Sequence, residues 1–288
     1  MAVAMNTRIG GTVLRSRPLV AIGRAALDLL PGSLPLVAKD WVNRVRLPEY
    51  REIRNFESHV LSQLGHPATV LSGPFAGMPY SGRAHHSRLL PKLLGTYEKE
   101  LHGVFEVIRR IEPDLIVDVG AAEGYYVTGF ARLCPSARIV AFEMERSARA
   151  LLRAACRRCR IESRVQIRGL CTIAQLRGAL AGASKAVLLA DCEGAENELL
   201  DPATIPDLSS ATILVETHDA KVPGVGARIE SRFEATHAVE QIRTRVRTPA
   251  DLPPGTLLSD QDALEAMTER SLPQIFLFMR PRNDRTRA

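Results

Sequence analysis

The hydrophobic pattern of the chain changes near residue 114. From there on, short apolar runs rich in β-branched residues alternate with stretches in which apolar residues recur at helical spacing. The pattern predicts seven strands, at 115–119, 138–143, 165–168, 186–191, 212–216, 238–247 and 274–280. It predicts helices at 125–133, 147–159, 172–180, 195–200, 226–233 and 261–269. This alternation is typical of an α/β fold, a doubly wound and mostly parallel seven-stranded sheet with helices on both faces.

The residues before this region lack the alternation. Apolar residues recur at helical spacing in 48–64 and predict one helix there, whereas prolines and glycines punctuate 66–95 and predict loops that could cover a cleft. Thr96 is expected to cap a further helix. The predicted organisation is an N-terminal extension of helices and loops over 1–90, which could serve as a cap, followed by the main domain over 91–288.

Composition excludes several classes of protein. The 288 residues are 45% hydrophobic and 24% charged, so wholesale disorder is excluded. Charged residues interrupt every apolar run before it reaches the roughly 18 residues of a membrane span. The five cysteines are scattered and odd in number, which favours a reducing cytoplasm over a disulfide framework. The net charge of +6 permits an acidic partner without requiring one.

The most informative segment follows the first predicted strand. Residues 117–126 read Val-Asp-Val-Gly-Ala-Ala-Glu-Gly-Tyr-Tyr, a glycine-bearing turn that opens a helix. Gly120 permits a tight turn and a close approach of the backbone to a ligand. A dinucleotide fingerprint would need a second glycine where Ala122 stands, and Glu123 puts a carboxylate where a pyrophosphate would arrive. The loop therefore favours a ligand without phosphates.

An acidic residue ends the second predicted strand. Glu143 stands 23 residues after Gly120, close to the offset of about 20 residues at which an acid binds a ribose diol. S-adenosyl-L-methionine carries a ribose and positive charge but no phosphate, and its sulfonium and amino groups are compatible with Asp118 and Glu123. The predicted cofactor is therefore S-adenosylmethionine, and the alternative is a sheet whose glycine only makes a turn.

Acids gather where the fourth and fifth predicted strands end. The fourth ends in Asp-Cys-Glu-Gly-Ala-Glu at 191–196, in which Asp191 and Glu193 are better candidates than Glu196, whose place early in a helix is equally explained by the helix dipole. The fifth ends with Glu216 and His218. Because ligands bind beyond the carboxyl ends of parallel strands, these side chains are candidates for acid–base work, and His218 could take a proton from a hydroxyl.

These segments resemble, in this order, the class I S-adenosylmethionine methyltransferase pattern of the FkbM type. The resemblance rests on 117–126, Phe142-Glu143, 191–196 and 215–218, with Leu94-Gly95-Thr96-Tyr97-Glu98 upstream, and covers about residues 90 to 280. The Asp-x-Glu-Gly-Ala-Glu segment is its more specific part. The resemblance implies a Rossmann-like methyltransferase fold with strand order 3-2-1-4-5-7-6, the seventh strand antiparallel. It also implies methyl transfer to a hydroxyl, often of a sugar or polyketide.

Site residues carried over by position are expectations of this resemblance. Those that would bind the cofactor are Glu98, Asp118, Gly120, Ala121, Ala122, Glu123, Gly124, Tyr126, Glu143, Met144 and Asp191. In the family loop an Asn commonly precedes a small apolar residue, and Ala122-Glu123 depart from that pattern. For catalysis, the hypothesis is that Asp191 or His218 takes the hydroxyl proton while Glu193 and Glu216 orient it.

Alternatives remain open at this stage. A divalent metal held by Asp191, Glu193 and His218 is possible, but activation without a metal is favoured. The predicted acceptor is a small molecule or a glycan, and nucleic acid is disfavoured because no aromatic residues interleave the arginines. A methyltransferase for RNA or protein and a non-catalytic binding module are the competing hypotheses. The sequence leaves the oligomeric state open.

Overall fold

The computed structural model describes residues 48–80, 82–85, 87–270 and 273–282. The chain divides into two compact units, 1–58 and 59–288. The helix predicted over 48–64 is confirmed as α3 (Pro48–Gln63). The earlier part of the predicted extension lies outside the described residues, and the predicted domain boundary near residue 90 stays a prediction.

The predicted seven-stranded, mostly parallel sheet is confirmed. Its strands are β1 (Leu115–Val119), β2 (Arg138–Phe142), β3 (Val165–Arg168), β4 (Ala186–Ala190), β5 (Thr212–Thr217), β6 (His237–Arg243) and β7 (Ile275–Pro281). They lie in the order β3-β2-β1-β4-β5-β7-β6. The first five strands run parallel, and β7 pairs antiparallel with both β5 and β6. This is the strand order that the resemblance implied.

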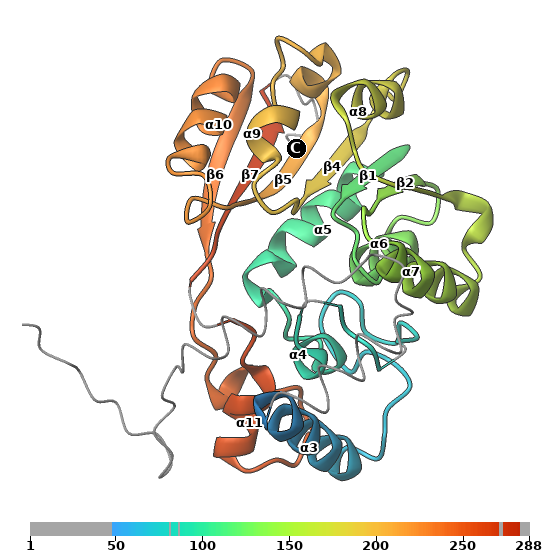
Figure 1. Cartoon of the computed structure of the whole chain (residues 1–288), viewed down its shortest axis with the longest axis vertical. Helices are drawn as coiled ribbons and strands as arrows, with labels where there is room; N and C mark the ends of the chain where they lie inside the picture. Colours follow the sequence, from blue (N-terminus) through green and yellow to red (C-terminus); the bar gives the residue numbers. More distant parts are fainter. Residues whose placement is uncertain (1–47, 81, 86, 271–272, 283–288) are drawn as a thin grey trace, which may run out of the picture. The chain divides into compact units, whose positions relative to one another are not determined.

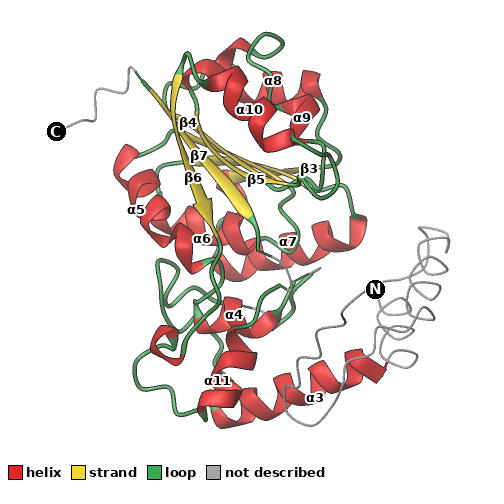
Figure 2. Ribbon diagram, turned by 90° about the vertical axis from the view of Figure 1, so that its left-hand side faces the viewer, coloured by secondary structure: helices red, strands yellow, loops and turns green. Residues whose placement is uncertain are grey.

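Helices cover both faces of the sheet (Figures 1 and 2). One face carries α5 (His102–Ile111), α6 (Tyr125–Leu133) and α7 (Arg146–Cys159), and the other carries α8 (Ile173–Leu180), α9 (Glu196–Leu199) and α10 (Val225–Phe233) (Figure 2). Two further helices, α4 (Leu89–Leu94) and α11 (Asp260–Met267), contact each other away from the two faces of the sheet (Figure 1). Short 3₁₀ turns lie at η1 (Lys99–Leu101), η2 (Glu162–Arg164), η3 (Pro206–Ser210) and η4 (Pro249–Asp251). Among the described helices, none combines the length and apolar character that crossing a bilayer demands.

Two hydrophobic clusters sandwich the sheet, because successive side chains of a strand point to opposite faces. Ile116 of β1 joins the cluster that holds Val104 of α5 and Phe130 of α6. Leu115 and Val117, its neighbours in the strand, join the cluster with α8 and α10. Every residue of β1 is buried, as expected of a central strand covered on both faces.

Three predicted elements differ from the structure. Thr96 does not cap a helix, because Glu98 adopts a left-handed conformation and α5 begins only at His102, after η1. The sixth strand ends at Arg243 rather than at residue 247, since Arg247 turns to pair with Glu100. The stretch predicted as loops over 66–95 contains the buried helix α4.

The loop after β1 passes very close to the ends of two neighbouring strands. The amides of Gly120 and Ala121 both donate to the Phe142 carbonyl at the end of β2, at 2.9 and 3.0 Å. Gly120 has a φ of +93°, and a Cβ there would lie 1.8 Å from the Asp191 carbonyl oxygen beyond β4. Only glycine fits this position without moving the backbone.

Gly120→Ala should therefore destabilise the fold by at least about 2 kcal/mol, from backbone strain and overlap with the Asp191 carbonyl. Gly178→Ala is the matched control, because Gly178 lies inside α8 with nothing within 4 Å of an added Cβ. The control should stabilise by roughly 0.5–1 kcal/mol through helix propensity. Chemical denaturation of both variants measures the difference. A Gly120→Ala protein as stable as wild type would contradict the proposed close passage.

Candidate active site

A cavity of about 620 Å³ opens at the carboxyl ends of β1, β2, β4 and β5. Most of the predicted site residues line it: Gly120, Ala121, Ala122, Glu123, Tyr126, Glu143, Met144, Asp191, Glu193, Glu216 and His218. Glu98 and Asp118 line a smaller adjoining cavity of about 40 Å³. Gly124 lines neither; it begins α6 with a φ of +93°, where a Cβ would meet Leu152 at 2.4 Å.

Glu143 lies directly after β2 and is held at the cavity by two backbone amides. Its Oε2 accepts from Ala122 N at 2.8 Å and its Oε1 accepts from Glu145 N at 2.7 Å. Each carboxylate oxygen can accept further hydrogen bonds. Two large apolar side chains of the same lining, Met144 and Leu170, are 69% and 61% exposed. On this side of the cavity, a carboxylate held by two amides therefore lies beside exposed apolar side chains.

The Glu123 carboxylate is buried, and both of its oxygens accept hydrogen bonds. Its Oε1 accepts from Lys92 Nζ at 2.5 Å and from the Tyr80 hydroxyl at 2.8 Å, and its Oε2 accepts from the His85 amide at 3.0 Å. Burial raises the pKa of Glu123, but the Lys92 ammonium outweighs it and lowers that pKa overall. The charge that was expected to disfavour phosphate is therefore paired with the Lys92 ammonium.

Arg270 joins two acids at the floor of the site. Its Nη2 donates to Glu98 Oε1 at 2.6 Å and to the Tyr97 hydroxyl at 3.1 Å, while its Nη1 donates to Glu216 Oε1. The other oxygen of Glu98 accepts from the Tyr126 hydroxyl. Glu98 and Glu216 are 2% and 3% exposed, so this is a buried ion network. Sequence reasoning missed Arg270, because it follows a short helix and no motif marks it.

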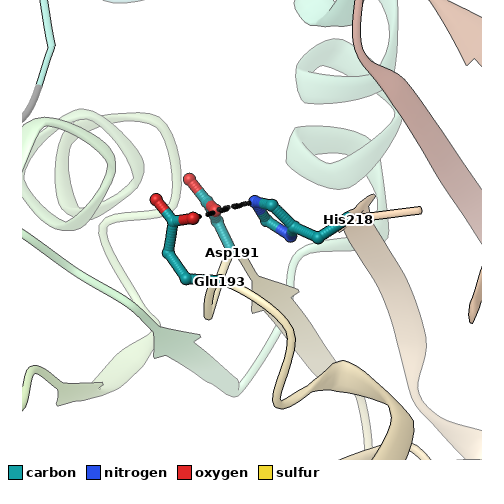
Figure 3. Close-up of side chains that lie close together, drawn as sticks. All are labelled: Asp191, Glu193 and His218. Carbon is teal, nitrogen blue, oxygen red and sulfur yellow. Dashed lines mark ion pairs between the residues drawn. The ribbon is translucent and has the colours of Figure 1, made fainter. Parts of the chain in front are cut away.

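Asp191, Glu193 and His218 converge from the ends of β4 and β5 (Figure 3). His218 Nε2 lies 3.5 Å from Asp191 Oδ1 and 3.5 Å from Glu193 Oε2. The Asp191 and Glu193 side chains are 45% and 64% exposed, whereas that of His218 is 9% exposed. The two carboxylates thus stand at the cavity with the imidazole behind them, as the strand ends predicted.

Glu196 fixes the orientation of His218. Its carboxylate is fully buried and receives the amides of Cys192 and Gly194 at 3.0 and 2.8 Å. Its Oε1 also accepts from His218 Nδ1 at 2.8 Å, so Nε2 is the nitrogen that faces Asp191 and Glu193. The sequence alone did not assign this role to Glu196, since the first turn of a helix explains an acid equally well.

The acids around the imidazole favour a positive charge among them. Burial opposes the charge of His218, but the hydrogen bond to Glu196 and the nearby carboxylates outweigh it and raise the pKa of His218. Burial and the charge of Glu98 raise the pKa of Asp191 to about 6. Burial and the charge of Asp191 raise the pKa of Glu216 to about 8. These shifts show that the acids repel one another when charged, a repulsion that a bound proton or cation would relieve.

Comparisons with known proteins give the following similarities. No protein-family model matches the chain, and no curated protein matches it. A solved O-methyltransferase from Bacillus cereus in complex with SAH is 13% identical over 83% of this chain and 96% of that one, with a TM-score of 0.41. The O-methyltransferase TomG from Streptomyces achromogenes in complex with SAM is 13% identical over 83% and 94%, with a TM-score of 0.40.

A precorrin-6y C5,15-methyltransferase from Geobacter metallireducens GS-15 is 12% identical over 62% of this chain and 85% of that one, with a TM-score of 0.43. TM-scores and identities this low assign no activity. The assignment of a function therefore rests on the residues of the site, and the resemblance to the FkbM type stays a prediction.

Asp118 leads to a stability prediction. Asp118 lies in β1 and is 4% exposed, and its Oδ2 has no hydrogen-bond partner among the described residues. Burial raises its pKa to about 8, with smaller contributions from the charges of Asp191 and Glu143. Between about pH 4 and pH 8 the folded state holds a proton that the unfolded state releases, so the stability from this group falls as pH rises.

Asp118→Asn removes this titration and keeps the shape of the side chain. Measured without cofactor, its unfolding free energy relative to wild type should rise by roughly 3 to 4 kcal/mol between pH 5 and pH 8. Asp260→Asn, at the exposed start of α11, is the control and should show no such trend. Parallel curves for wild type and Asp118→Asn would show that the buried carboxyl does not hold a proton.

Proposed function

We propose that the chain is an S-adenosylmethionine-dependent methyltransferase that methylates a hydroxyl group of a small-molecule, sugar or polyketide-like acceptor. The observation that carries the proposal is a single cavity with two kinds of wall. One wall has the glycine loop, Glu143 and exposed apolar side chains, and another has Asp191, Glu193 and His218. Its volume of about 620 Å³ lies within the usual range of ligand pockets.

The first wall suits the nucleoside part of the cofactor. Glu143, fixed by two amides, can accept hydrogen bonds from the ribose hydroxyls. The exposed side chains of Met144 and Leu170 offer apolar surface for the adenine ring. The loop from Gly120 to Ala122 leaves room for the backbone to approach the methionine part.

Charge in the lining supports a cofactor without phosphates. Three Lys and Arg side chains line the described part of the cavity, and each is bound to a carboxylate: Lys92 to Glu123, Lys221 to Glu193, and Arg270 to Glu98 and Glu216. Their charges are therefore compensated before a ligand arrives. Asp191 and Glu143 remain as acids that favour the sulfonium and ammonium groups of S-adenosylmethionine.

The second wall suits activation of an acceptor hydroxyl. The bound cofactor supplies an already activated methyl carbon, so the chain mainly has to align the acceptor and help its proton leave. In this proposal Asp191 or His218 takes the proton of that hydroxyl, and Glu193 and Glu216 orient it; the mutual proximity of the four side chains supports these roles. Glu196 keeps the imidazole in the required orientation.

The free state of all five cysteines supports a reducing location, the cytoplasm.

Isothermal titration with S-adenosylmethionine and S-adenosylhomocysteine tests the cofactor. Wild type should bind with micromolar affinity, about −8 kcal/mol. Glu143→Gln should bind at least tenfold more weakly, because an amide replaces one acceptor of the ribose hydroxyls. Glu240→Gln is the control, since Glu240 is exposed on β6. Unchanged affinity in folded Glu143→Gln would remove the assigned ribose contact, and no binding by folded wild type would remove the cofactor.

Methyl transfer is tested with labelled cofactor and a panel of hydroxyl-bearing acceptors. With an acceptor that wild type methylates, His218→Ala and Asp191→Asn should each lower kcat by about 100-fold, the size of a typical proton-transfer contribution. His218→Ala should keep the affinity for S-adenosylhomocysteine within about threefold, because His218 faces the acceptor side in this proposal. Full turnover by both variants would eliminate the assigned roles.

A further inference from the structure

We propose that Asp191, Glu193 and His218 bind a divalent transition-metal ion such as Mn²⁺ or Zn²⁺. Each offers one ligand atom, two carboxylate oxygens and one imidazole nitrogen, and these atoms all lie within 4.8 Å of one another. Figure 3 shows both carboxylates turned toward the imidazole. Mixed oxygen and nitrogen ligands suit these ions better than Ca²⁺ or Mg²⁺, which prefer oxygen alone.

The spacing of the atoms favours a shared cation over direct hydrogen bonds. His218 Nε2 lies 3.5 Å from an oxygen of Asp191 and 3.5 Å from an oxygen of Glu193. This separation is beyond a normal N–H···O distance. Ligand atoms about 2.1 Å from one cation lie about 3.0 to 3.4 Å apart. Small movements of the two exposed carboxylates would therefore bring the three atoms to coordination distance.

The second contact of the imidazole is the kind that metal-binding histidines make. His218 Nδ1 donates to the fully buried Glu196, whose position two backbone amides also fix. Such a carboxylate sets the tautomer and directs the lone pair of Nε2 toward the metal. Glu196 is thus a positioning residue.

A fourth carboxyl supplies an independent indication of a missing cation. Glu216 lines the same cavity, is 3% exposed, and has its Oε1 3.8 Å from His218 Nε2. Its Oε2 has no hydrogen-bond partner among the described residues. A buried oxygen without a partner is costly, and a cation with its bound water would give it one.

Lys221 competes with the proposed metal. Its ammonium contacts Glu193 Oε2, the same oxygen that faces His218. The lysine side chain is 52% exposed and can swing away without leaving a buried charge. Removing this ammonium should therefore strengthen metal binding, an outcome that a merely structural cluster would not produce.

The role of the metal rests on the proposed function, although its binding does not. The cation would polarise an acceptor hydroxyl and lower its pKa. With the cation bound, Asp191 and His218 would act on the hydroxyl through the cation instead of taking its proton themselves. The proton would leave to water, and the oxygen would bond to the methyl carbon as the carbon–sulfur bond breaks.

The test is isothermal titration of chelator-treated full-length protein with Mn²⁺ and with Zn²⁺, without cofactor or acceptor. Wild type should bind one equivalent. Glu193→Gln and His218→Ala should each weaken binding at least tenfold, and Lys221→Met should tighten it. Glu198→Gln, an exposed acid nearby on α9, is the control and should match wild type. Zn²⁺ should also shift the Nε2 resonance of one histidine, and this signal should be absent in His218→Ala.

No binding by wild type, or unchanged binding in Glu193→Gln and His218→Ala, would overturn the proposal. Because Glu193 is exposed, Glu193→Gln is expected to fold and keeps the test valid if His218→Ala does not. Separate titration with S-adenosylhomocysteine distinguishes the two ideas. A protein that binds the cofactor but no metal retains the proposed function, whereas one that binds the metal but no cofactor retains only the cation site.

Discussion

The close passage of the β1 loop between the ends of β2 and β4 is the constraint on which the site depends. Two consecutive amides of this loop share the Phe142 carbonyl, and Gly120 leaves no room for a side chain against the Asp191 carbonyl. One backbone segment thus sets the distance between the strand that presents Glu143 and the strand that presents Asp191. A shift of the loop would move both carboxylates, so the two walls of the cavity are coupled through main-chain contacts.

Ion pairs hold segments that are distant in the sequence at the border of the cavity. Lys92 of α4 binds Glu123 at the start of α6, and Arg270, after α11, binds Glu98 and Glu216. These three pairs are largely buried, and a buried pair contributes little net stability because the cost of desolvation offsets the attraction. Removing one partner is strongly destabilising, however, because it leaves a buried charge without compensation. These pairs therefore act mainly to fix which segments border the cavity.

Sequence patterns predicted the elements that depend on local periodicity and on motifs. The alternation after residue 114 predicted all seven strands, and the strand ends predicted that Asp191, Glu193 and His218 converge. The buried ion pairs around the site could not be predicted, because the contacts of Lys92 with Glu123, of Glu196 with His218 and of Arg270 with Glu98 arise only when the chain folds. Thr96 shows the same limit: its sequence suits a helix cap, but the left-handed turn at Glu98 is set by contacts with Arg270 and Glu269.

Glu123 shows how one unseen partner changes the meaning of a motif. As an isolated acid in the loop it indicated electrostatic exclusion of phosphate, but Lys92 compensates it. The negative character of the cavity arises instead from acids clustered beyond β4 and β5, where four carboxyls surround one imidazole. Such a cluster would be unfavourable as a mere scaffold, since like charges at these distances raise one another's pKa. Arg270 and Lys221 relieve part of this repulsion, and the proposed metal ion would relieve more of it.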